Sequence, residues 1–206
     1  MKETTYAALL SRADHRLLAY TNYTIECRTE FLEKNQEYGQ TWLMYRPKSL
    51  LQRIWNKGFR IRSIQDKKEQ LIGDTILSEF TAIYNYCIIA LIVIEKMKSD
   101  YLTISIPVTL EPIHESLSIP YETAMNACTE LFKKKDHDYD GAWVQMKIST
   151  IIDEVLVKLL RVASILEKDV PVDEMKKKLA EIFMDIANYA IFASILIKEV
   201  DVNPLS

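Results

Sequence analysis

The sequence predicts an all-α protein in which two tandem three-helix repeats form one pseudo-twofold helical bundle. The 206 residues include only 4 Gly and 6 Pro, which favours long helices over a turn-rich β fold. Apolar residues recur at intervals of three and four, as at Ile151, Val155, Leu159 and Val162, and this spacing is typical of helices that bury one face. The chain also resembles itself when it is shifted by about 101 residues.

This internal repeat is clearest where residues 27–64 are aligned with residues 128–165. In the ungapped comparison 9 of 38 positions are identical, and they include Trp42 and Trp143. Chance would give about two or three identities at average residue frequencies. A shift of 103 then aligns the "NY" at 85–86 with the "NY" at 188–189. We infer that the chain is a tandem duplication.

Each repeat is expected to contain three helices, and a leading helix is expected over about 4–19. In the first repeat the loop "EYGQTW" separates the first two helices, and in the second Thr150 and Pro171 are expected helix starts. The expected ranges are about 21–36, 48–65 and 70–97, then about 121–135, 149–167 and 172–199. The corresponding units are an N-terminal repeat with a degraded site (1–100), a proline-containing connector (101–120) and a site-bearing C-terminal repeat (121–206), packed together as one globular unit.

Composition favours a cytoplasmic protein without a membrane span or a stable nucleic-acid complex. The net charge is −3, and the three cysteines form no C-x-x-C pair. With no signal peptide expected, the thiols are expected to be reduced. The most apolar stretch, residues 80–94, is shorter than the roughly 20 residues of a membrane helix and is expected to be a core helix. A homodimer in addition to the internal pseudo-dimer is compatible with the sequence.

Aromatic residues recur in the loops of both repeats. Tyr38 aligns with Tyr139, and Trp42 aligns with Trp143. These rings could stack on a nucleobase, because an aromatic face binds any base. They could equally fix the loop onto the bundle, since large aromatic side chains dominate core packing. In the second loop, Asp136, His137 and Asp140 are specific to this repeat, and they could serve only solubility.

Two cationic positions also recur, three residues apart on one helix face. Lys57 and Arg60 align with Lys158 and Arg161. They could hold phosphate oxygens, or they could form ion pairs or a solvated face. Over residues 27–64 there are eight Lys and Arg against three acids, whereas over 128–165 there are six against six. A basic half beside a carboxylate-bearing half would suit a metal-bound polyphosphate, or two halves that attract each other.

Four carboxylates occur only in the second repeat, which carries Asp153, Glu154, Glu181 and Asp185 where the first has Gln52, Arg53, Ser78 and Ala82. Glu181, Asp185 and Asn188 fall at i, i+4 and i+7 of one helix and so share a face. If that face meets the preceding helix, the four carboxylates could converge and bind Mg²⁺ or Mn²⁺ together with substrate phosphates. The alternatives are a helix cap formed by Thr150 and Asp153, and an exposed polar face for the others.

Three motifs of the second repeat resemble the nucleotide modification associated domain, type 1. They are "K-x-x-D-Y-x-x-A-W" (135–143), "D-E-x-x-x-K-x-x-R" (153–161) and "E-x-x-x-D-x-x-N-Y-A" (181–190). The resemblance is clearest over about 126–193, and a degraded version covers about 26–91. That family is thought to be related to the all-α, MazG-like NTP pyrophosphohydrolases. The resemblance therefore implies an all-α bundle, dependence on Mg²⁺, and cleavage of an NTP or dNTP to the monophosphate and pyrophosphate.

The resemblance also implies roles for individual residues. Glu154, Glu181 and Asp185 fall at metal-ligand positions and would be catalytic, with Asp153 as a further metal ligand. The substrate-binding set would be Asp138, Tyr139, Lys158, Arg161 and Asn188, with Lys57 and Arg60 from the first repeat. Two departures from the MazG-like pattern stand out: Lys158 lies nearest to the missing second carboxylate of the first pair, and the second pair is spaced i, i+4. The alternative is a non-catalytic nucleotide-binding, regulatory or structural bundle.

Overall fold

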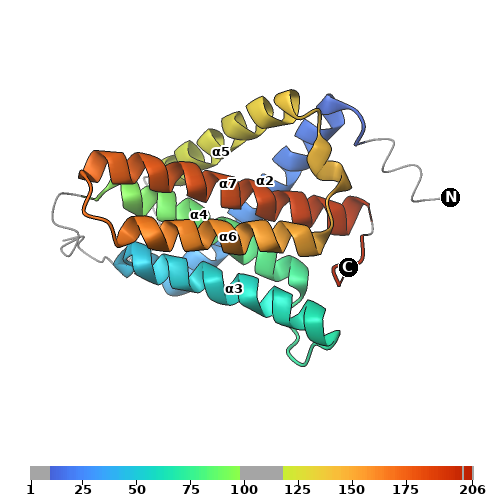
Figure 1. Cartoon of the computed structure of the whole chain (residues 1–206), viewed down its shortest axis with the longest axis horizontal. Coiled ribbons are helices and arrows are strands. Elements are labelled where there is room, and N and C mark those ends of the chain that lie inside the picture. The colour runs from blue at the N-terminus through green and yellow to red at the C-terminus, as the bar shows by residue number, and fades with distance from the viewer. Residues whose placement is uncertain (1–9, 98–117, 201, 206) are drawn as a thin grey trace.

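The computed structural model describes residues 10–97, 118–200 and 202–205, and these residues form a helical bundle with no strand (Figure 1). Two short 3₁₀ helices, η1 (Thr41–Met44) and η3 (Ala142–Gln145), follow the first long helix of each repeat. The six long helices are α2 (Ala13–Tyr38), α3 (Pro47–Lys67), α4 (Ile76–Glu95), α5 (Ser118–Asp138), α6 (Ile148–Leu166) and α7 (Val172–Glu199). The predicted all-α class is therefore confirmed.

The third helix of each repeat forms the centre of the bundle. α4 and α7 pack on each other, α3 and α6 lie side by side against them, and α2 and α5 each contact both central helices (Figure 1). By length and composition alone α4 and α7 could cross a membrane, but 67% and 61% of their apolar windows are buried inside the bundle. This burial favours core helices, as expected for residues 80–94, whereas the cytoplasmic location stays a prediction.

A buried polar link joins the two repeats twice, in symmetric fashion. Tyr20 of α2 donates a hydrogen bond to Asn188 of α7 at 2.6 Å, and Tyr121 of α5 donates to Asn85 of α4 at 2.7 Å. Each asparagine amide also donates to a backbone carbonyl on the first helix of its own repeat. Because buried polar groups are costly unless they are paired, these links fix how the repeats interlock.

The first long helix differs from the prediction. Instead of separate helices over 4–19 and 21–36, α2 runs without interruption from Ala13, while residues 1–9 lie outside the described part of the chain. No Gly or Pro interrupts residues 13–38, and the fully buried Tyr20 continues the apolar face across the expected break. The predicted break was therefore wrong.

Other boundaries shift by a few residues for identifiable reasons. α4 begins at Ile76 rather than near residue 70, because the Thr75 hydroxyl caps it by accepting from the Ser78 backbone N–H. α6 begins at Ile148, so Thr150 lies inside the first turn and the predicted cap with Asp153 is wrong. Val172 begins α7 directly after Pro171, as predicted. Most of the predicted connector lies outside the described residues, but its last three residues (118–120) form the first turn of α5, where proline is tolerated.

Candidate functional site

Each repeat holds a cavity at the same place, between its first helix, the following loop and its other two helices. The C-terminal pocket, of about 420 Å³, is lined in part by Lys135, Tyr139, Trp143, Lys158, Asp185 and Tyr189. The N-terminal pocket, of about 540 Å³, is lined by the aligned residues Lys34, Tyr38, Trp42, Lys57, Ala82 and Tyr86. Both volumes lie in the range of small-molecule sites. The duplication therefore produced two equivalent cavities with different charges.

In the C-terminal pocket two ammonium groups meet one carboxylate. Lys135 donates to one oxygen of Asp185, and Lys158 donates to the other at 2.8 Å. Lys158 also lies 5.6 Å from the centroid of the Tyr189 ring. Burial raises the pKa of the Asp185 carboxyl, but the hydrogen bonds and charges of the two lysines outweigh burial, so the pKa lies below its ordinary value. The Asp185 carboxylate thus holds both ammonium groups at the cavity.

This lowered pKa makes the contribution of Asp185 to stability dependent on pH. Since the folded protein favours the ionised carboxyl, the contribution is complete above the ordinary pKa of 3.8 and is lost as the pH falls through the lower folded value. We expect Asp185→Asn to lower the free energy of unfolding at pH 7, and to lower it less at pH 3. Urea unfolding of both proteins at the two pH values measures the difference. An equal cost at both pH values would contradict the lysine–carboxylate arrangement.

The two aromatic residues of the second loop have different environments. Trp143 is buried, stacks on Phe192 with ring centroids 4.5 Å apart, and donates to Asp136. Tyr139 is 70% exposed at the rim of the pocket. Trp143 therefore fixes the loop to the bundle, whereas the ring of Tyr139 is free to cover a ligand.

Asp136 is a central structural residue, not the solubilising one that was predicted. Its side chain is only 6% exposed, and both of its oxygens accept hydrogen bonds from Nε of Arg16, each at 2.9 Å. Arg16, only 3% exposed, also donates to two backbone carbonyls near the start of α2. Asp140 and His137 are exposed, as expected. Nothing in the local sequence indicated this partnership, because Arg16 lies 120 residues away from Asp136.

The four carboxylates predicted to converge do not form one cluster. Asp153 is 60% exposed and pairs with Arg62 of α3, and Glu181 is exposed on α7. Glu154 is half-buried, and its charge, with that of Asp185, adds to burial in raising the pKa of Tyr189. Within the described residues, no three Asp, Glu, His or Cys side chains are grouped so that they could hold a metal ion. This arrangement does not fit a divalent metal by itself, and Mg²⁺ or Mn²⁺ stays a prediction.

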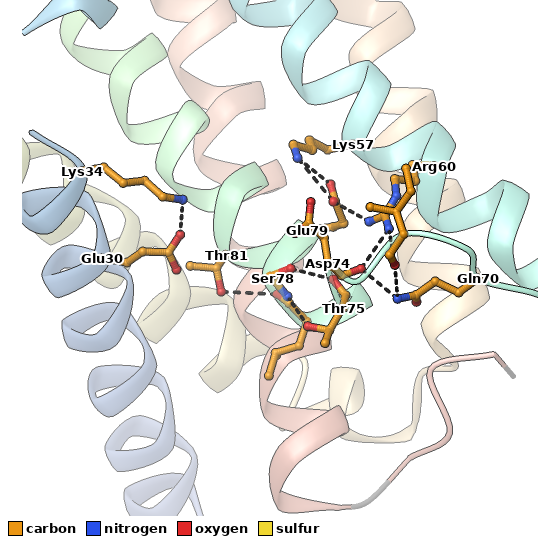
Figure 2. Close-up of polar contacts among 12 residues, drawn as sticks. Glu30, Lys34, Lys57, Arg60, Gln70, Asp74, Thr75, Ser78, Glu79 and Thr81 are labelled. Atoms are coloured by element: carbon orange, nitrogen blue, oxygen red, sulfur yellow. Dashed lines mark hydrogen bonds and ion pairs between the residues drawn. The ribbon is translucent and has the colours of Figure 1, made fainter. Parts of the chain in front are cut away.

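In the first repeat Lys57 and Arg60 share one buried carboxylate, Glu79 of α4 (Figure 2). Nζ of Lys57 lies 3.0 Å from Glu79, whose side chain is 1% exposed, and Nη1 of Arg60 donates to it at 2.5 Å. Arg60 also donates to the backbone carbonyl of Asp74 at 2.9 Å, and this hydrogen bond anchors the loop before α4 to α3. It borders a separate cavity, of about 660 Å³, at the end of α3. Lys57 alone of these two cations lines the N-terminal pocket.

The aligned lysines of the two repeats therefore form ion pairs with acids at different positions: Lys57 pairs with Glu79, and Lys158 pairs with Asp185. Glu79 aligns with Ile182, and Asp185 aligns with Ala82, so the carboxylate has moved by one helical turn along the third helix. A position-by-position alignment cannot show this exchange, because neither acid is aligned with an acid of the other repeat.

The remaining predicted substrate-binding residues occupy three kinds of position. Asn188 is 3% exposed, binds Tyr20, and forms part of the wall of the C-terminal pocket. Asp138 is exposed beside His137, outside the residues that line the pocket. Arg161 is exposed on α6 and does not line the pocket either. Their roles in binding a substrate stay predictions.

Comparison with known proteins agrees with the duplication. The family model described as nucleotide modification associated domain 1 matches residues 34–94 and 135–197, which together make up more than half of the chain. The two matched segments end in α4 and α7 and include the lysines of both pockets. No curated protein and no solved structure matches the chain.

Proposed function

The chain belongs to the nucleotide modification associated domain 1 family, and from this premise we propose that it binds a nucleotide in the C-terminal pocket. The observation that carries this proposal is the pair of ammonium groups, Lys135 and Lys158, that Asp185 holds at one aromatic-lined cavity. Phosphate groups of the nucleotide would accept hydrogen bonds from the two ammonium groups.

The lysine–carboxylate arrangement leaves room for a phosphate. An ammonium group has three N–H donors, and Lys135 and Lys158 each use one on Asp185. The remaining donors can serve phosphate oxygens, and Asp185 restricts the motion of both lysine side chains beforehand. Such ordering lowers the entropic cost of binding.

Two tyrosines can receive the base. Tyr139 is exposed at the rim, and the half-buried Tyr189 contacts the edge of Phe192 with centroids 5.9 Å apart. Base–aromatic stacking contributes about 1–3 kcal/mol and tolerates any base. The pocket therefore combines a place for a charged phosphate with a place for a planar ring.

A thermal-shift panel tests the proposal. Nucleoside triphosphates and monophosphates, with the matching nucleosides as controls, are added with EDTA and with Mg²⁺. We expect nucleotides to raise the melting temperature in a concentration-dependent way, and nucleosides to raise it much less, because a ligand of the folded state stabilises it by mass action. If no nucleotide shifts the melting temperature under either condition, the proposal is wrong.

Hydrolysis of a nucleoside triphosphate to the monophosphate and pyrophosphate is a second candidate function. It is favoured by one observation: Asp185, one of the expected catalytic carboxylates, lines the C-terminal pocket. Pyrophosphate release from a panel of NTPs and dNTPs, with and without Mg²⁺ or Mn²⁺, tests it. Metal-dependent release that is lost in Glu154→Gln and Asp185→Asn would support hydrolysis, and absence of release would leave binding alone.

A further inference from the structure

The first repeat, expected to be the degraded half, holds the more basic of the two cavities. At three aligned positions the acids of the second repeat are absent: Asn35 replaces Asp136, Ala82 replaces Asp185, and Arg53 replaces Glu154. The charge rises by one unit at each of the first two positions and by two at the third. Among the described residues that line the N-terminal pocket there is no Asp or Glu.

Three cations line this pocket, and the acids that pair with two of them lie outside its lining. Lys34 binds Glu30, one turn earlier on α2, in an exposed pair (Figure 2). Lys57 shares Glu79 with Arg60, so one buried carboxylate faces two cations. This part of the site therefore keeps an excess of positive charge.

Arg53 supplies the third cation. Its side chain is exposed, and within the described part of the chain it forms no ion pair. Its guanidinium lies 5.2 Å from the centroid of the Tyr45 ring, and Tyr45 meets Tyr86 edge-on at 6.4 Å. The aligned residue of Tyr45 is Met146, so the first repeat has gained an aromatic ring as well as a cation at this pocket.

We propose that the N-terminal pocket is a second binding site, for a nucleoside monophosphate taken up without a divalent metal. Lys34, Arg53 and Lys57 would neutralise the phosphate, and an arginine fork suits two phosphate oxygens at once. Tyr45 and Tyr86 would contact the base. Since none of the described residues that line the cavity is a carboxylate, cations from the chain replace the metal that an acidic site would need. This site does not depend on the C-terminal pocket.

Calorimetric titration with the four ribonucleoside monophosphates in EDTA tests the proposal. Arg53→Gln removes the cation without an ion pair, and Ala82→Asp installs the acid that the second repeat carries at the aligned position. Both positions are at least partly exposed, so both variants are expected to fold. Each is expected to weaken binding about tenfold, as for a lost charge-assisted contact. Arg62→Gln, which removes another arginine of α3 outside the pocket, is the matched control and should bind as the wild type does.

Lys158→Gln separates the two pockets. Monophosphate binding that survives Lys158→Gln but weakens in Arg53→Gln and Ala82→Asp assigns the site to the first repeat. The proposal is overturned if no monophosphate binds the wild type, or if Arg53→Gln and Ala82→Asp bind as tightly as the wild type. Loss in Lys158→Gln alone would overturn it while leaving nucleotide binding by the C-terminal pocket intact.

Discussion

Replacement of Arg16 by methionine is expected to lower the free energy of unfolding by about 3–5 kcal/mol. The ion pair between Arg16 and Asp136 is almost fully buried, and methionine keeps most of the length of the side chain but none of its charge. Asp136 would remain as a buried carboxylate with only the indole of Trp143 as a donor among its described contacts. Two backbone carbonyls would lose a donor as well. Denaturant unfolding monitored by circular dichroism measures the loss.

The first repeat suggests the control for this prediction. There Asn35 takes the place of Asp136, accepts from the indole of Trp42 at 2.6 Å, and donates to the backbone carbonyl of Phe31. In the first repeat a neutral amide therefore accepts the hydrogen bond from the loop tryptophan, and no buried charge at that position needs an arginine as partner. We expect Asp136→Asn, added to Arg16→Met, to recover a large part of the lost stability. If the double variant is no more stable than Arg16→Met alone, an unpaired charge is not the cause of the loss.

Replacement of both Lys135 and Lys158 by glutamine is expected to weaken nucleotide binding by the C-terminal pocket at least about a hundredfold. A hydrogen bond to a charged group contributes about 1.5–3 kcal/mol, and the double variant removes two such donors while it leaves the negative charge of Asp185 in the pocket. The variants are made in a background that carries both Arg53→Gln and Ala82→Asp, so that binding by the N-terminal pocket is weakened as well.

Lys133→Gln is the matched control for this pair. Lys133 lies on α5 two residues before Lys135, is 46% exposed, and pairs with Glu130 on the outside of the helix. We expect it to leave the affinity unchanged. Equal weakening by Lys133→Gln would show that general charge, rather than the two lysines at Asp185, attracts the nucleotide.

Much of the fold could be predicted, because the repeat and the helical spacing are both local patterns. The core helices α4 and α7 and the start of α7 at Pro171 follow from apolar runs and a boundary residue. The continuous α2 was not predicted, although no Gly or Pro interrupts residues 13–38, because the side chains near the expected break are buried by the second repeat. Tyr20, for example, meets Asn188, and such a distant contact leaves no trace in the local sequence.

The candidate site could be predicted only in part. Lys158 and Asp185 were both identified, but the expectation was that the acid would meet other acids, whereas it meets two lysines. Glu79 was not predicted as a site residue, because it aligns with Ile182. The acid that pairs with the aligned lysine in the second repeat, Asp185, lies one turn further along the helix. An alignment compares residues position by position, whereas an ion pair needs only that two side chains reach each other. The exchange of the acid that pairs with the aligned lysines can therefore be seen only in the three-dimensional structure.

Equilibrium titration of the chain that carries Arg53→Gln and Ala82→Asp, with nucleoside triphosphates and with the matching nucleosides, tests the proposed C-terminal binding site most directly. The expected result is that triphosphates bind at least about tenfold more tightly than nucleosides, and that this preference disappears in the variant that also lacks Lys135 and Lys158. Nucleosides that bind as tightly as triphosphates, or a preference that persists without the two lysines, would contradict a phosphate site at Asp185.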